Sequence, residues 1–191
     1  MELTDYNGEF DPNVKLEDFS KEFLARIMRE WGAAYMRVGE AWYNAARKKL
    51  SEEDAIECEL EIWAGKPMEI TLPRIAKAMN LQPKTILDVL KVWQLIPDGL
   101  ATGLHTASYE IKNENHIIWN IERCGTMEYY ERAGQPERLM AMCHKIDPAA
   151  LDKYLKALLP NAEIKPLKLP SGPRQDPTES PVCTWELKLE S

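Results

Sequence analysis

The period of the hydrophobic pattern changes once along the chain, at the turn sequence Pro97-Asp98-Gly99. Before this turn, apolar residues recur at steps of three and four, which is typical of one face of an α-helix. After it, short segments alternate apolar and polar residues, as β-strands with one buried side do. We therefore predict an α+β protein in which a helical N-terminal half (16–97) packs on an antiparallel sheet with covering helices (98–191). Residues 1–15 are expected to form an irregular arm, and the two halves one compact unit.

A long helix is predicted to begin at Leu16. Its apolar residues fall on one stripe that is expected to be buried: Phe19, Phe23, Ile27, Trp31, Tyr35, Val38, Trp42 and Ala45. Gly32 and Gly39 lie seven residues apart on one side of this helix, which favours close approach of another element over a kink. The helix over 16–50 is also a candidate surface for pairing two copies of the chain.

The second half is predicted to start with a hairpin that turns at Asn113-Glu114-Asn115. Its second strand, 116–124, shows Ile117, Trp119 and Ile121 on one face, and on the other a polar set: His116, Ile118, Asn120, Glu122 and Cys124. Asp147-Pro148 is typical of a helix N-cap and first turn. Pro166 indicates an edge strand, and the last strand is expected to bury Cys183, Trp185 and Leu187.

Residues 75–90 resemble a helix-turn-helix, with Asn80 able to adopt the left-handed turn. An ordinary pair of antiparallel helices requires the same small, turn and apolar residues. Segment 71–95 holds four Lys/Arg against one Asp/Glu in a chain of net charge -7, so few phosphates could be neutralised. Nucleic acid is therefore not the expected partner.

The N-terminus is acidic and polar, unlike a signal peptide, and no apolar run is long enough to span a membrane. Four cysteines in such a chain do not indicate a disulfide framework. We expect a cytoplasmic protein with reduced thiols, and the sequence indicates no particular cofactor.

The cysteines and histidines of the C-terminal third allow three interpretations. In the first, Cys124 or Cys143 is a nucleophile, His144 or His116 is its base, Glu131 orients the imidazole, and Arg132 favours the thiolate. In the second, Cys124, Cys143, His144 and Cys183 bind zinc, although their spacing is not that of known zinc sites, and no metal site is predicted. In the third, the cysteines are small core residues.

The order Cys124, Glu131-Arg132-Ala133-Gly134, Cys143, a helix from Asp147 and a closing Cys183-Thr184-Trp185 resembles a known pattern. It is similar to the L-2-amino-thiazoline-4-carboxylate hydrolase-like family and its uncharacterised bacterial relatives, and more distantly to 4-vinyl-reductase-type small-molecule-binding domains. The resemblance covers about the last 70 residues and matches Cys124, Cys143 and Cys183, with Arg132 beside them. It implies an α+β domain that binds a small molecule and, in the named member, hydrolysis of a cyclic amidine-like C–N bond.

We therefore expect a small-molecule-binding protein. The more specific expectation is a hydrolase-like enzyme that acts on a small cyclic C–N substrate. The pocket is expected between the long helix and the strands 116–124 and 182–190. Arg132, His116, Tyr129 and Trp119 are the candidate substrate-binding residues. Two alternatives stay open: a helix-turn-helix regulator with a ligand-sensing C-terminal half, and a non-catalytic assembly protein.

Overall fold

The computed structural model describes residues 2–99 and 102–189, and it confirms the α+β class. The helical half consists of a 3-10 turn and four helices: Leu16–Asp18, α1 (Lys21–Arg47), α2 (Glu52–Trp63), α3 (Lys66–Ala78) and α4 (Ile86–Gln94). The second half contains these elements: β1 (His105–Asn113), β2 (His116–Cys124), α5 (Gly125–Ala133), α6 (Pro136–Ala141), a π-helical turn (Met142–Ile146), α7 (Asp147–Leu158), β3 (Ala162–Lys168) and β4 (Cys183–Leu189).

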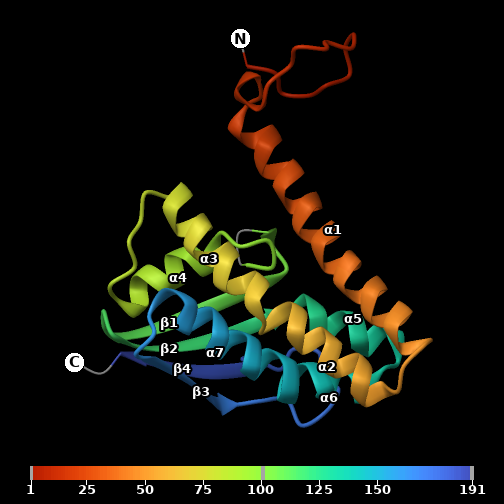
Figure 1. The fold of residues 1–191 in the computed structure, drawn as a ribbon, viewed down its shortest axis with the longest axis vertical. Helices are drawn as coiled ribbons and strands as arrows, with labels where there is room; N and C mark the ends of the chain where they lie inside the picture. Colours follow the sequence, from red (N-terminus) through yellow and green to blue (C-terminus); the bar gives the residue numbers. More distant parts are fainter. Residues whose placement is uncertain (1, 100–101, 190–191) are drawn as a thin grey trace.

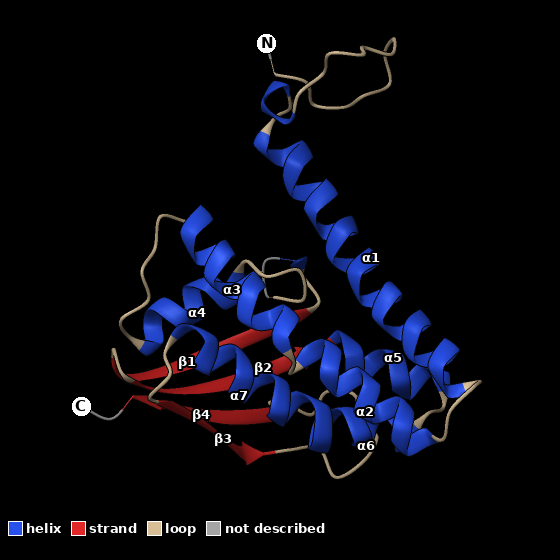
Figure 2. Ribbon diagram, viewed as in Figure 1, coloured by secondary structure: helices blue, strands red, loops and turns tan. Residues whose placement is uncertain are grey.

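The four strands form one antiparallel sheet in the order β1-β2-β4-β3. The helices gather on one side of this sheet (Figure 2), with α4 contacting β2 and β4, and α7 contacting β3. Pro166 lies in β3 at the edge of the sheet, as predicted, where its missing N–H removes no ladder bond from a central strand. Trp185 and Leu187 are buried, and Cys183 is partly exposed.

One hydrophobic core joins the two halves, because its buried members extend from Tyr43 in α1 to Leu187 in β4. The link between α3 and α4 contains Asn80 in the predicted left-handed conformation, with φ of 53°. Ile86 and Val89 of α4 are fully buried. The connection between β3 and β4 is irregular, and the part of the chain that the structure describes contains no helix long and apolar enough to cross a membrane.

The prediction for α1 is wrong in two respects. The helix begins at Lys21 rather than Leu16, because Ser20 caps it by accepting a hydrogen bond from the Phe23 N–H. The predicted stripe is also not the face that packs on the rest of the chain, since Trp31 is 59% exposed and Val38 is 68% exposed. Periodicity shows which residues share a face, but it does not show which of two adjacent faces is covered.

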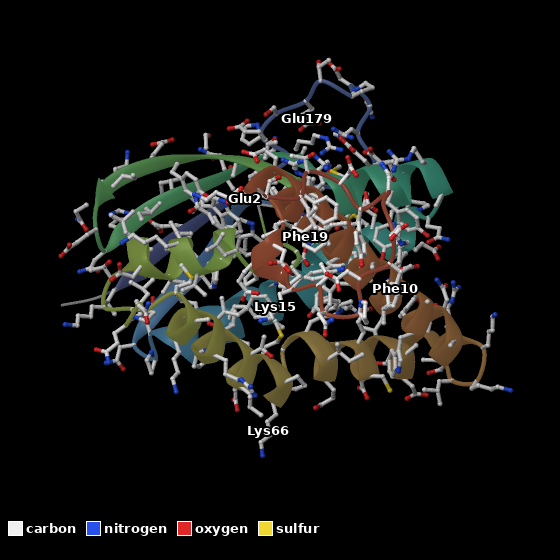
Figure 3. The ribbon with its side chains drawn as sticks, turned by 90° about the horizontal axis from the view of Figure 1, so that it is seen from above. Glu2, Phe10, Lys15, Phe19, Lys66 and Glu179 are labelled. Carbon is white, nitrogen blue, oxygen red and sulfur yellow. The ribbon has the colours of Figure 1, made fainter. Side chains whose placement is uncertain are left out.

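The face of α1 that does pack is the one with the two glycines, and here the prediction of close approach is confirmed. A Cβ at Gly32 would stand 2.6 Å from the Pro97 carbonyl oxygen, and one at Gly39 would stand 2.9 Å from the Trp63 ring. Beyond this contact the N-terminal part of α1 projects from the body and carries the first residues at its tip (Figure 1). Figure 3 shows the molecule from above, with the N-terminal segment that contains Phe10, Lys15 and Phe19 toward the viewer.

A buried ion cluster ties the C-terminal part of α1 to α2 and α6. Arg138 is 4% exposed and donates to Glu59 at 2.6 Å, while its guanidinium carbon lies 3.6 Å from the centre of the Tyr43 ring. Glu40 accepts a hydrogen bond of 2.7 Å from the Tyr130 hydroxyl and lies 3.7 Å from Arg138. The cluster fixes the direction in which α1 leaves the body.

Candidate functional site

A cavity of about 140 Å³ lies between the helix-covered face of the sheet and the helices above it. Its walls are mostly apolar, and five large aromatic residues from five different elements contribute to them: Trp63, Trp93, Trp119, Tyr154 and Trp185. The ring of Trp93 lies 5.6 Å from that of Trp119 and 6.4 Å from that of Tyr154, measured between centroids. Such walls favour a small, flat and largely apolar ligand.

Four side chains that can carry charge or transfer a proton also line this cavity. His105 comes from the start of β1 and Cys124 from the end of β2, and the two residues are paired across the strands. Asp98 comes from the turn after α4, and Asp147 from the first position of α7. Convergent titratable groups in an otherwise apolar cavity are typical of a binding or catalytic site.

The position of Cys124 corrects the predicted hairpin. Thr106 pairs with Arg123, but Ala107 pairs with Ile121, so Glu122 is an extra residue in β2. This β-bulge reverses the alternation of side chains, because two successive residues then occupy one step of the partner strand. Cys124 consequently faces the cavity with Trp119 and Ile121 instead of lying on the polar face with His116.

Cys124 is also the residue immediately before α5. The Met127 N–H donates a hydrogen bond to its sulfur at 3.4 Å. The N-terminus of a helix carries partial positive charge, and the Cys124 sulfur lies beside it. Gly125 holds the arrangement by donating its N–H to the Leu104 carbonyl oxygen at 2.8 Å, one residue before His105.

His105 is held and charged by its neighbours. Its Nδ1 lies 3.2 Å from the Asp98 carbonyl oxygen. Burial of the imidazole is the largest single effect and opposes protonation, but Cys124, Asp98 and Asp147 together raise the pKa of His105 to about 9. A protonated imidazole beside a sulfur atom stabilises the thiolate and can later supply a proton.

The two carboxylates line the cavity, and neither forms an ion pair with a residue of the described ranges. Burial raises the pKa of Asp98, and its Oδ1 has no hydrogen-bond partner among the described residues. Burial also raises the pKa of Asp147 to about 6, partly offset by His105. Asp147 follows a π-helical turn, a distortion that often occurs at functional sites, and its side chain does not cap α7. The predicted capping role of Asp147 is therefore wrong.

Three indole N–H groups in the walls add further unused donors. The Nε1 atoms of Trp63, Trp93 and Trp119 are buried and lack an acceptor within residues 2–99 and 102–189. A buried polar atom without a partner is costly in free energy, commonly about 1–3 kcal/mol. A ligand with polar edges could satisfy some of these donors together with the Asp98 carboxylate.

Among the predicted site residues, Cys124 and Trp119 line the cavity. Cys143 is buried in the core, where burial raises the pKa of its thiol well above the usual range. His144 points away and lies with its Nε2 2.7 Å from the Pro170 carbonyl oxygen. Glu131 is bound to Arg174 of the β3–β4 connection, at 2.7 Å, and not to an imidazole.

The remaining predicted residues lie on the surface of the molecule. Arg132 is exposed on α5 and approaches Glu128 at 4.0 Å. Tyr129 is exposed and packs its edge against the Tyr130 ring. His116 lies on the polar face of the sheet, where its Nε2 is 2.9 Å from Glu186.

Sequence reasoning missed His105, Asp98 and Asp147. His105 precedes the segment in which alternation is visible, so the sequence does not indicate that it belongs to a strand. It nevertheless lies on the same face of β1 as Ala107 and Tyr109, which follow it at steps of two. Asp98 and Asp147 stand in ordinary turn and helix-start sequences. The residues of the zinc interpretation do not come together as a metal site. In the described ranges, no group of three His, Cys, Asp or Glu side chains could hold a metal ion.

The chain was compared with protein-family models, curated proteins and solved structures, and none of these comparisons gave a match.

Proposed function

We propose that this protein binds a small, flat, cationic molecule in the aromatic cavity and acts on it as a cysteine-dependent hydrolase of cyclic C–N bonds. The observation that carries the proposal is the pairing of His105 with Cys124 at the N-terminus of α5, inside a cavity that the Asp98 and Asp147 carboxylates also line. The arrangement supplies a nucleophile, a proton donor and a site for positive charge.

The carboxylates favour a ligand that carries its positive charge on nitrogen. Asp98 and Asp147 line one cavity with His105, and an additional cation would pair with the Asp98 oxygen that has no partner in the described part of the chain. A protonated cyclic amidine is flat and presents N–H groups to carboxylates. Its central carbon is electrophilic, which is what a thiolate requires.

The chemistry is then a two-step substitution. The Cys124 thiolate adds to the amidinium carbon, and the electron pair of the C=N bond moves to nitrogen. Protonated His105 gives its proton to the ring nitrogen as the C–N bond breaks, which leaves the opened molecule attached to sulfur. Water adds to the same carbon and gives a proton to His105, and the thiolate leaves with formation of an amide.

The test uses two compounds. The first is L-2-amino-thiazoline-4-carboxylate, the substrate implied by the family resemblance, and the second is 2-amino-thiazoline, the same ring without the carboxylate group. Hydrolysis is followed by mass spectrometry as the gain of one water, and binding by quenching of tryptophan fluorescence. We expect hydrolysis to fall at least about 100-fold in Cys124→Ser and in His105→Gln, with quenching retained. Quenching without hydrolysis in the wild type would reduce the proposal to ligand binding, and absence of both would contradict it.

The regulator alternative has weaker support. Five of the nine residues of α4 are buried: Ile86, Val89, Leu90, Val92 and Trp93. A DNA-reading helix must lay an exposed polar face in the major groove. On α4 that face contains Lys91 bound to Asp88 at 2.8 Å, so part of its positive charge is already neutralised.

A further inference from the structure

The outward face of α1 carries large apolar residues that the rest of the described chain leaves partly or largely exposed, although the Tyr35 ring also packs edge-on against Trp63 at 5.4 Å between centroids. Met28, Trp31, Tyr35, Val38 and Trp42 are 46, 59, 36, 68 and 42% exposed, and we call these five residues the α1 stripe. They follow one another at steps of three and four. Apolar residues at this spacing form the narrow contact line along which two α-helices pack side by side. A helix that covers a core has a wider apolar face.

The α1 stripe is distinct from the face that holds α1 to the body. Gly32 and Gly39 contact Pro97 and Trp63, and Tyr43 is buried against Arg138, so the body covers the adjacent side of the helix. The two faces are about 100° apart around the helix axis. The body therefore leaves the α1 stripe open to another molecule.

The area of this surface is close to what a stable pair of proteins requires. Aromatic side chains have accessible areas of about 150–250 Å², so the α1 stripe offers on the order of 500 Å² of apolar area. Phe10 and Leu16, 82 and 58% exposed, add apolar surface in the segment before α1. The seven residues together approach the roughly 800 Å² per partner of a standard interface. The α1 stripe alone is as large as the largest apolar patch of a typical monomer, about 300–600 Å², and such patches are often functional.

We infer that the α1 stripe is the interface between two copies of this chain. Ala41 and Ala45 are exposed beside it, and such small residues allow two helix backbones to approach closely. The whole of α1 has 27 residues, which is about 40 Å of helix, and its part before Gly32 projects from the body. An anionic lipid surface fits less well, since the chain has a net charge of -7.

The experiment is sedimentation velocity on the full-length protein between about 1 and 100 μM, which brackets the affinities of weak dimers. We expect a dimer that dissociates toward the low end of this range. Val38→Lys should raise the dissociation constant at least tenfold, and Trp31→Lys with Val38→Lys should leave a monomer. Circular dichroism is expected to show unchanged helix content, because both side chains are exposed in the single chain.

Control variants change the charge by the same amount beside the α1 stripe. Glu30→Gln adds one positive charge, as Val38→Lys does, and Glu30→Lys adds two, as the double variant does; Glu30 is exposed and off the stripe. Both controls should dimerise within about twofold of the wild type. A wild type that is monomeric at 100 μM overturns the inference, as does a dimer that survives the double variant. A monomer that sediments with anionic vesicles would assign the α1 stripe to a membrane surface instead.

Discussion

His105 and Cys124 stand opposite each other on β1 and β2, and both face the aromatic cavity. The pair lies where the first strand begins and the second ends, and where α5 starts. The Cys124 sulfur has a helix N-terminus on one side and an imidazole on the other, and both are neighbours that reactive cysteines commonly have.

The first prediction concerns thiol reactivity. Cys124 should react first with an alkylating reagent near neutral pH, whereas Cys143 and Cys183 should react slowly, because burial raises the pKa of Cys143 far above its usual range and that of Cys183 to about 12. Peptide mapping by mass spectrometry over time measures the order. Labelling of Cys58 before Cys124 would remove the main support for a nucleophile.

The second prediction concerns the charge of the ligand. Chloroacetamidine is a cation and chloroacetamide is its neutral analogue, so their rates at Cys124 report whether the cavity attracts positive charge. We expect the cation to react at least about tenfold faster, and Asp98→Asn or Asp147→Asn to reduce that ratio several-fold, since a factor of ten corresponds to about 1.4 kcal/mol. Glu131→Gln, which alters a carboxylate outside the cavity, should keep the ratio. Equal rates in the wild type would exclude cation recognition.

The third prediction concerns pH. The folded protein keeps His105 protonated up to about pH 9, whereas the unfolded chain releases the proton near 6.5. The stabilisation is therefore complete below pH 6.5 and is lost as the pH rises toward 9. His105→Gln should flatten this decline, by about 1–3 kcal/mol in the free energy of unfolding. Urea titrations at several pH values measure it, and His144→Gln, outside the cavity, should retain the wild-type slope.

The fourth prediction concerns the joint between β1 and α5. A Cβ at Gly125 would stand 2.7 Å from the Leu104 carbonyl oxygen, so Gly125→Ala must separate the two segments. We expect a loss of about 1–3 kcal/mol in stability and slower alkylation of Cys124. Gly8→Ala is the matched control, because nothing lies within 4 Å of its added Cβ. Unchanged alkylation in Gly125→Ala would mean that the position of Cys124 does not depend on this contact.

The fifth prediction concerns the buried ion cluster. Arg138→Met leaves Glu59 buried without its 2.6 Å partner and should cost about 3–5 kcal/mol of stability. Adding Glu59→Met should recover most of that loss, since a buried ion pair is often no more stable than apolar residues of similar volume. A double-mutant cycle by chemical denaturation measures the coupling. Additive losses would show that the two charges do not depend on each other.

The sequence predicts the parts of this fold that depend on local chemistry. The left-handed Asn80, the edge strand with Pro166 and the buried Trp185 follow from turn preference, a missing N–H and alternation. It does not predict which face of α1 is covered, because that depends on segments far along the chain. It also misses Asp98 and Asp147, since a turn or helix start has the same sequence whether its carboxylate faces water or a cavity.

The extra residue Glu122 in β2 shifts the alternation of inward and outward side chains by one position. The residues before the bulge and those after it therefore follow different alternation patterns. A strand with an unbroken frame would present the Cys124 thiol to bulk water, next to the polar surface that holds His116 and Glu186. The bulge shifts the alternation by one residue, so Cys124 faces the same side as Ile121 although the two residues are three positions apart. Deleting Glu122 would place Cys124 two positions after Ile121 and keep the thiol in the cavity, so only an alignment that applies strict alternation across the bulge would assign this thiol to the wrong side of the protein.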